Sequence, residues 1–246
     1  EKQMAKAPIK HQLSILAAGT FANILMTIIF GLLLWWFFAF SFAPGGVIFN
    51  TYAQSIVNVS DITHVGGVAI AGISTIPTLT VEGLNNITVL NKTYHSPKEA
   101  LSDEILSKNE QIIVFDDAPA ILANLFGAVT SIDGKQTRNQ PELSSVLSEV
   151  APGKIVRITT IDSEGVERSY DIKLAEKNGK AYLGVGFYGR STEGLRAKIQ
   201  SAFAKIKDPN INYVPTWDGD FAQYIYDLLW WIVIINVLVA LMNMLP

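Results

Sequence analysis

The chain has 246 residues with 19 basic and 22 acidic side chains, so its formal net charge is −3. It contains no cysteine, which excludes disulfide bonds and cysteine-ligated metal sites. It also lacks the basic surplus of nucleic-acid-binding proteins, so we expect no nucleic-acid partner. Hydrophobic residues are concentrated in two long uncharged runs that flank a polar middle segment.

The first uncharged run, Ser14–Ala43, is long enough to cross the hydrocarbon core of a bilayer, which requires about 20 residues. It is too long and too uniformly apolar for a core helix. It also exceeds the roughly 7–15 apolar residues of a signal peptide. Trp35 and Trp36 lie toward its end, where aromatic rings favour the headgroup level. We predict that residues 1–44 form a cytoplasmic flank and a transmembrane helix.

A short motif, Ala18-Gly19-Thr20-Phe21-Ala22-Asn23, lies near the start of this run. Its small residues permit close approach of a second helix, and the Asn23 amide can hydrogen-bond across such an interface. We therefore predict that Gly19 and Asn23 form a structural membrane motif, for which ordinary helix packing is a sufficient explanation.

The charged residues indicate the orientation of the chain. Three lysines precede the first run and place the N-terminus on the cytoplasmic side by the positive-inside rule: Lys2, Lys6 and Lys10. The middle is then extracytoplasmic. We divide it into a segment at 45–110 that is a candidate partial PDZ-like repeat, a domain at 111–190, and an amphipathic helix with a linker at 191–220.

The middle segment has the pattern of a small α+β domain. Lys154–Ile161 and Val166–Leu174 alternate apolar and polar residues on either side of a glycine-containing turn, which predicts a β-hairpin. Pro141–Val150 has apolar residues at helical spacing, and Val129–Gly134 reads as a strand that enters an Asp-Gly turn.

A weak internal echo occurs at an offset of 42 residues. The pairs are Pro77 with Pro119, Ile87 with Val129, Leu90-Asn91 with Ile132-Asp133, and Leu101 with Leu143. A structural repeat and a chance similarity between two strand–turn–helix segments both explain it.

Ser191–Lys207 predicts an amphipathic helix, because Leu195, Ile199, Phe203 and Ile206 form one apolar stripe. We favour packing against the domain, since no tryptophan anchors the stripe. A helix that lies on the membrane surface is the alternative.

The second uncharged run ends the chain, and we predict a transmembrane helix at 221–246. It carries two amides, which are costly in a bilayer unless they face protein or a cavity. Asn236 is interpreted as a bond between helices. In Asn243-x-x-Pro246, Pro246 breaks the helix and frees backbone groups, so Asn243 is the stronger functional candidate. Because the run has no polar exit, we expect that the chain is part of a longer protein.

Several motifs together resemble the site-2 protease family of zinc intramembrane metalloproteases. They are Ala18-Gly19-x-x-x-Asn23, Ile132-Asp133-Gly134-Lys135 and Asn243-x-x-Pro246. The middle segment is similar to that family's PDZ domain through Ala118-Pro119-Ala120, Ser131–Lys135, Pro152-Gly153-Lys154 and Tyr182-Leu183-Gly184-Val185. The run Ala123–Ala128 departs from the family's Ala-Gly-Leu-x-x-Gly-Asp pattern, which predicts an altered peptide groove.

The resemblance implies a zinc ion in the full-length parent and none bound by this chain. In the family, a His-Glu-x-x-His motif and the aspartate of a Leu-Asp-Gly motif hold the metal, and both would lie outside this chain. His11, His64 and His95 are scattered and have no ligand spacing. The resemblance implies that Asn243 lies beside the substrate strand or the developing oxyanion. It also implies that Pro246 opens the helix toward the zinc.

The expected fold is two transmembrane helices plus an extracytoplasmic PDZ-like α+β domain. The expected function is that of a fragment of an intramembrane protease that acts in regulated intramembrane proteolysis and is inactive alone. Its expected partners are a membrane-embedded protein substrate, a peptide or protein at the PDZ-like substrate filter, and the lipid bilayer. One alternative is a non-enzymatic membrane-anchored sensor or scaffold domain. Another is a transporter subunit with a large outer domain.

Overall fold

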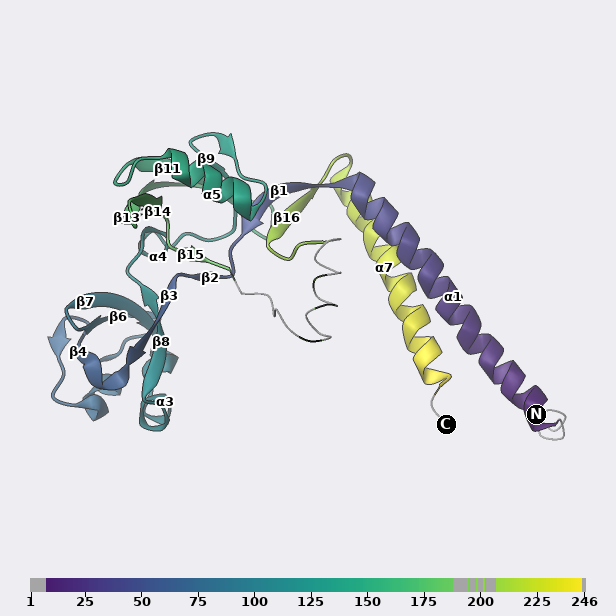
Figure 1. Ribbon diagram of the computed structural model, residues 1–246, viewed down its shortest axis with the longest axis horizontal. Coiled ribbons are helices and arrows are strands. Elements are labelled where there is room, and N and C mark those ends of the chain that lie inside the picture. Colours follow the sequence, from purple (N-terminus) through teal and green to yellow (C-terminus); the bar gives the residue numbers. More distant parts are fainter. Residues whose placement is uncertain (1–7, 188–193, 195–197, 199–200, 202–206, 245–246) are drawn as a thin grey trace. The chain divides into compact units, whose positions relative to one another are not determined.

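The computed structural model describes residues 8–187, 194, 198, 201 and 207–244 (Figure 1). The chain divides into two compact units. One contains the two ends of the chain, up to Pro44 and from Tyr213 onward. The other contains Gly45–Asn212. Two long apolar helices therefore flank a β-rich region, which agrees with the coarse layout expected from the sequence.

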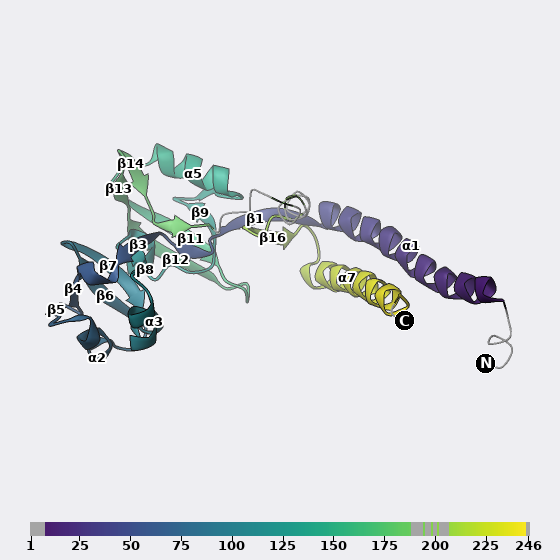
Figure 2. The same ribbon diagram turned by 60° about the horizontal axis from the view of Figure 1, so that its bottom comes forward.

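The first unit is a pair of helices, α1 (Ile9–Ser41) and α7 (Gly219–Met242), which run side by side in both views (Figures 1 and 2). Both helices are long and apolar enough to cross a membrane, by length and composition alone. The start of α7 is fixed by Asp218, whose side chain accepts a hydrogen bond from the Phe221 amide at 3.1 Å. Pro246 lies outside the described residues.

The two helices pack through stripes in which less exposed residues recur every three or four positions, as in a coiled coil. On α1 the stripe consists of Thr20, Asn23, Thr27, Phe30, Leu34, Phe37 and Ser41. On α7 it consists of Ala222, Tyr226, Leu229, Val233, Asn236 and Ala240. Large apolar side chains cover the opposite faces of both helices and are exposed.

Aromatic rings join the helices where α1 ends and α7 begins. The ring of Phe38 lies 5.3 Å from that of Phe42, 4.9 Å from that of Tyr213 and 5.8 Å from that of Tyr226. The amide of Thr216 also donates to the carbonyl of Ser41 at 2.9 Å. These contacts hold the segment before α7 against the last turn of α1.

The second unit is built on two antiparallel sheets. The first contains, in order, β3 (Gln54–Asn58), β8 (Gln111–Asp116), β7 (Lys92–Pro97), β6 (Leu84–Val89), β4 (Ile62–Val65) and β5 (Val68–Ala69). The second contains β12 (Glu167–Lys173), β11 (Ile155–Ile161), β9 (Ala128–Ile132), β1 (Phe42–Ile48) and β16 (Ile211–Pro215), with β10 (Lys135–Gln136) beside β9. Two short ladders pair β13 (Ala175–Lys177) with β14 (Lys180–Tyr182), and β15 (Val185–Gly186) with β2 (Thr51–Tyr52).

The helical elements of this unit are short. They are the 3-10 helices η2 (Val59–Asp61), η3 (Ile73–Thr75) and η4 (Lys98–Leu101) and the α-helices α2 (Ile76–Leu79), α3 (Asp103–Lys108), α4 (Pro119–Leu122) and α5 (Gln140–Glu149). The predicted amphipathic helix Ser191–Lys207 falls largely outside the described residues.

The elements predicted between residues 129 and 174 are confirmed. β11 and β12 form the expected hairpin, in register from Ile155 opposite Lys173 to Ile161 opposite Glu167. α5 begins at the expected place because the Asn139 side chain accepts a hydrogen bond from the Glu142 amide at 2.9 Å. β9 ends at the Asp133-Gly134 turn, where both residues have positive φ.

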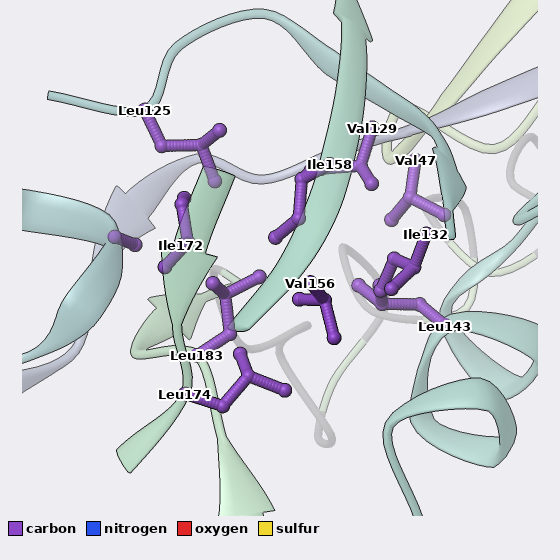
Figure 3. Close-up of a cluster of buried hydrophobic side chains, with 11 residues drawn as sticks. Val47, Leu125, Val129, Ile132, Leu143, Val156, Ile158, Ile172, Leu174 and Leu183 are labelled. Carbon is purple, nitrogen blue, oxygen red and sulfur yellow. The ribbon is translucent and has the colours of Figure 1, made fainter. Parts of the chain in front are cut away.

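Each sheet has its own hydrophobic core. The second core contains Val47, Ala120, Leu125, Val129, Ile132, Leu143, Val156, Ile158, Ile172, Leu174 and Leu183 (Figure 3). The first core contains Val57, Val59, Ile62, Val65, Ile76, Ile87, Val89, Leu101, Leu106, Ile112 and Val114. β8 follows the predicted boundary at residue 110, yet it belongs to the first sheet.

The internal echo corresponds to equivalent places in the two cores. Both prolines of the echo lie in the first turn of a four-residue helix, α2 and α4. Ile87 and Val129 are both fully buried, and so are Leu101 and Leu143 to within a few per cent. The strand pairing differs, because β8 pairs with β7 whereas β11 pairs with β9. The matched residues therefore occupy similar places in the two cores, while the strand arrangement around them differs.

Candidate functional site

In α1 from Ala18 onward, and in α7 from Leu228 to Met242, the polar side chains lie on the less exposed stripes through which the helices pack. On α1 from Ala18 onward, the polar residues are Thr20, Asn23, Thr27 and Ser41, and none of them is exposed. On α7, Asn236 lies on the corresponding stripe. This placement removes the amides and hydroxyls from the apolar outer surface, as expected of helices that face hydrocarbon.

Two of these side chains bind the backbone of their own helix. The Thr27 hydroxyl donates to the carbonyl of Asn23 at 2.8 Å. The Asn236 Nδ2 donates to the carbonyl of Ile232 at 2.8 Å. The sequence predicted that Asn236 bonds between helices, and this bond instead lies within α7. Because this bond uses the side-chain N–H of Asn236 within α7, that N–H needs no acceptor on α1.

Gly19 and Asn243, two of the predicted site residues, lie next to each other. A Cβ atom added at Gly19 would lie 3.7 Å from Asn243 Nδ2. The backbone N–H of Asn243 donates to the carbonyl of Val239 at 3.0 Å and closes the last turn of α7. Asn23 lies one turn further along α1 on the stripe that faces α7. The motifs near the two ends of the chain thus meet at one end of the helix pair.

This end of the helix pair can offer hydrogen bonds but no proton transfer by an ionised group. The segments 18–41 and 228–244 contain no charged residue and no histidine. Amide and hydroxyl groups at Asn243, Asn23 and Thr20 can donate to or accept from a polar group that enters beside them. An extended peptide with unsatisfied backbone groups is one such partner in an apolar environment.

Two of the three histidines, His64 and His95, belong to the β-rich unit. His64 Nδ1 lies 3.0 Å from the Thr63 hydroxyl, and the buried His95 Nε2 lies 2.8 Å from Asp117 Oδ1. His11 is in α1, and its side chain is outside the described part of the chain. Within the described residues, no three or more His, Asp or Glu side chains gather closely enough to hold a metal ion.

The Ile132-Asp133-Gly134-Lys135 motif has a structural role in the second sheet. Asp133 accepts hydrogen bonds from the Arg157 amide at 2.8 Å and from Lys154 Nζ at 3.0 Å. These bonds, the backbone one foremost, lower the pKa of the Asp133 carboxyl. Arg157 in turn pairs with Asp171 at 2.9 Å, which lowers the pKa of that carboxyl too.

The departure at Ala123–Ala128 is a tight turn against β11. Asn124 and Gly127 both have positive φ. A Cβ atom at Gly127 would lie 2.7 Å from the carbonyl oxygen of Ile161, so only glycine fits there without movement. The Arg168 guanidinium lies 5.0 Å from the centre of the Phe126 ring and covers the turn.

Sequence reasoning missed a pocket of about 610 Å³ beside the first sheet. Its walls are the segments 58–60 and 106–110, together with Ile73. The two segments are distant in sequence and carry no recognisable motif, so only their pairing in the fold reveals the pocket.

No family model matches the chain, and a search of curated proteins found no significant match either. The resemblance to site-2 proteases therefore depends on the motifs and on their positions in the fold.

Proposed function

We propose that this chain is the central part of a zinc-dependent intramembrane protease of the site-2 type, which cleaves transmembrane substrates in regulated intramembrane proteolysis. The observation that carries the proposal is the proximity of Gly19 to Asn243. Two motifs that are far apart in the sequence meet, and they are the motifs on which the resemblance depends.

In this proposal α1 and α7 span the membrane. Their outer faces carry exposed apolar side chains, while the polar side chains of α1 face α7. Trp35 and Trp36 near the end of α1, and Tyr224 and Tyr226 near the start of α7, are suited to the headgroup level, whereas Trp230 and Trp231 lie at the middle of α7. The N-terminus is cytoplasmic and the β-rich unit is extracytoplasmic.

Asn243 would act as a hydrogen-bond donor beside the substrate. A fixed amide that points at the scissile carbonyl stabilises the oxyanion more strongly than it stabilises the ground state. It also satisfies a backbone group of an unwound substrate helix, which would otherwise be costly in the membrane. Gly19 lies beside the amide, and α7 ends at Met242, directly before Asn243.

A catalytic zinc ion does not fit the described residues, because they offer no set of three ligands. In this proposal the metal and the general base belong to other parts of the enzyme. The chain alone would then bind and orient a substrate without hydrolysing it.

The second sheet and the helix α5 would act as the substrate filter. The partly buried side chains of Val146 and Leu147 on α5, and of Val150 directly after it, pack against the same core as Val185 and Phe187. A peptide that adds a strand to this sheet beside α5 is the mode of binding typical of PDZ-like domains.

A non-enzymatic membrane-anchored sensor or scaffold is the second candidate. It is favoured by the local hydrogen bonds of Thr27 and Asn236, which need no substrate. In that case Asn243 would only end the helix.

Cleavage of a model transmembrane substrate by the full-length protein distinguishes these functions. Asn243→Ala should lower the rate by about 10²- to 10³-fold, the loss typical of one oxyanion donor. The matched control is Asn236→Ala, which removes an amide that binds its own helix and should keep most of the activity. Equal rates for wild type and Asn243→Ala would contradict the proposed role of Asn243. Absence of any cleavage would favour the sensor.

A further inference from the structure

The segment from β2 to β3 has a different neighbour on each side. The Ala53 amide donates to the carbonyl of Gly184 at 2.8 Å, immediately before β15. The Ala53 carbonyl accepts from the amide of Asp116, at the end of β8, also at 2.8 Å. β15 and β8 therefore lie on opposite sides of this segment. β15 pairs with β2 and does not extend along β3.

The side of β3 that continues from β15 has no strand beside it among the described strands, since β3 is the last strand of its sheet. The Val59 amide donates to Glu110 at 2.9 Å, on the β8 side. Because backbone groups alternate between the two sides of a strand, Ser55 and Val57 also face β8. The N–H and C=O groups of Gln54, Ile56 and Asn58 then point to the open side.

The open edge carries an apolar surface. Ile56 is 68% exposed, and the residue opposite it, Ile113 on β8, is 57% exposed. Exposed apolar edge strands are sites for pairing with another chain, and proteins usually protect them with charges or proline. Neither protection occurs within Gln54–Asn58.

The pocket of about 610 Å³ begins where this edge ends. Asn58, the last residue of β3, lines it, and the buried side chains of Val59 and Leu106 contribute its apolar part. Ile73 lines it as well and is 42% exposed. The volume is sufficient for one or two side chains of a bound peptide.

The charges around the pocket are mainly negative. Glu110 lines it directly, and Asp61 accepts a hydrogen bond from Asn58 at 2.9 Å. The ammonium of Lys108 is paired with Glu104 at 2.8 Å. Because Glu104 and Lys108 neutralise each other, Glu110 and Asp61 give this region a negative excess, and a basic partner is favoured there.

We propose that the open edge of β3 and this pocket together bind an extended peptide segment that has apolar residues in alternation and basic residues between them. The main chain of the peptide would pair with Gln54, Ile56 and Asn58 and continue the line of β15. One apolar side chain would fill the pocket, and the basic residues would face its carboxylates. This site is separate from the PDZ-like region and does not depend on proteolysis.

The test uses the full chain in lipid nanodiscs and a fluorescein-labelled peptide of seven alternating lysine and valine residues. Fluorescence anisotropy gives the dissociation constant. Methylation of alternate backbone nitrogens on one edge of the peptide, with the side chains kept, should weaken binding by about tenfold or more, because it removes the ladder donors. A peptide with glutamate in place of lysine should bind at least about tenfold more weakly.

Two variants and one control locate the site. Ile56→Pro removes an amide that points to the open side, and Ile73→Lys places a positive charge at the pocket. Each should weaken binding by about tenfold. Val166→Lys changes an exposed apolar residue in the turn between β11 and β12 and should leave binding unchanged. The proposal would be overturned if both N-methylation and Ile73→Lys left the affinity unaltered, or if Val166→Lys weakened binding equally. Ile73→Lys decides the matter where Ile56→Pro fails to fold.

Discussion

Gly19 lies against the end of α7, so close that a methyl group in its place would be 3.7 Å from Asn243 Nδ2. This separation is an ordinary van der Waals contact, so an alanine at position 19 would touch the Asn243 side chain without strain. The relation joins the start of the first apolar run to the end of the second. It also determines which substitutions at position 19 the helix pair tolerates.

A cysteine pair measures this proximity directly, because the chain has no cysteine of its own. We expect that Gly19→Cys with Asn243→Cys forms a disulfide on mild oxidation, which keeps both helices in one fragment after proteolysis between them. The matched control combines Gly19→Cys with Leu238→Cys, since the Leu238 side chain is exposed on the outer face of α7. Crosslinking of the control as efficient as that of the test pair would contradict this helix arrangement.

Gly184→Ala should destabilise the β-rich unit more than other glycine substitutions. A Cβ atom there would lie 2.2 Å from the Ala118 Cβ, and Gly184 has a φ of +87°. Gly153→Ala is the control, because Gly153 has a φ of +79° but nothing within 4 Å. Both variants carry the backbone strain of about 1–2 kcal/mol, and only Gly184→Ala adds overpacking of about 1–3 kcal/mol.

Hydrogen exchange of strands β9 to β12 gives the local free energy of opening for these variants. Adding Ala118→Gly to Gly184→Ala removes the clashing methyl group. The double variant should be more stable than Gly184→Ala alone. It should remain less stable than Gly153→Ala by the cost of the new glycine at position 118. A double variant no more stable than Gly184→Ala alone would indicate that the clash is not the cause.

The second sheet should lose stability in acid, when the carboxyl groups of Asp133, Asp162 and Asp171 become protonated. The pKa of each carboxyl is lowered in the folded state, for Asp133 and Asp162 chiefly by backbone N–H donors and for Asp171 by Arg157. A lowered folded-state pKa gives stability that is present above the unfolded pKa of about 3.9 and is lost as the pH falls below it. The side chains of Asp133 and Asp171 are 37% and 60% exposed and are screened by solvent, so the effect of these two is modest.

Thermal unfolding between pH 2 and pH 6 tests this expectation. Asp133→Asn should flatten the acid limb of the stability curve, because it removes one of the groups that bind protons on unfolding. Asparagine tolerates the positive φ of position 133, so the turn keeps its shape. An unchanged pH dependence in Asp133→Asn would exclude this carboxyl as a contributor.

Local patterns in the sequence predicted where helices and strands form better than they predicted which strands pair with each other. The uncharged runs became α1 and α7, and the alternation in 154–174 became the β11–β12 hairpin. Periodicity identifies a strand but does not name its neighbour. The pairing of β3 with β8 joins segments more than fifty residues apart, from Gln54 opposite Phe115 to Asn58 opposite Gln111. The pocket beside that ladder was therefore not predictable.

The candidate site was predicted only in part for a related reason. Gly19, Asn23 and Asn243 were found because amides and small residues are unusual in an apolar run. The proximity of Gly19 to Asn243 was not predicted, because no local pattern shows which parts of two helices meet. The hydrogen bond of Asn236 was predicted wrongly, because an amide within a helix can bind the carbonyl four residues earlier instead of a neighbouring helix.

Asn236→Leu provides a test of that correction. Its Nδ2 group bonds to Ile232 within α7, so the substitution removes no donor to α1 and keeps an apolar side chain on the packed stripe. We expect a change in the unfolding free energy of the helix pair below about 1 kcal/mol, near the average of hydrogen bonds in membrane proteins. Val233→Ala, one turn earlier on the same stripe, is the comparison and should cost more through lost packing. A loss above about 2 kcal/mol for Asn236→Leu, measured by reversible unfolding in mixed micelles, would mean that the remaining amide groups of Asn236 hold α1 after all.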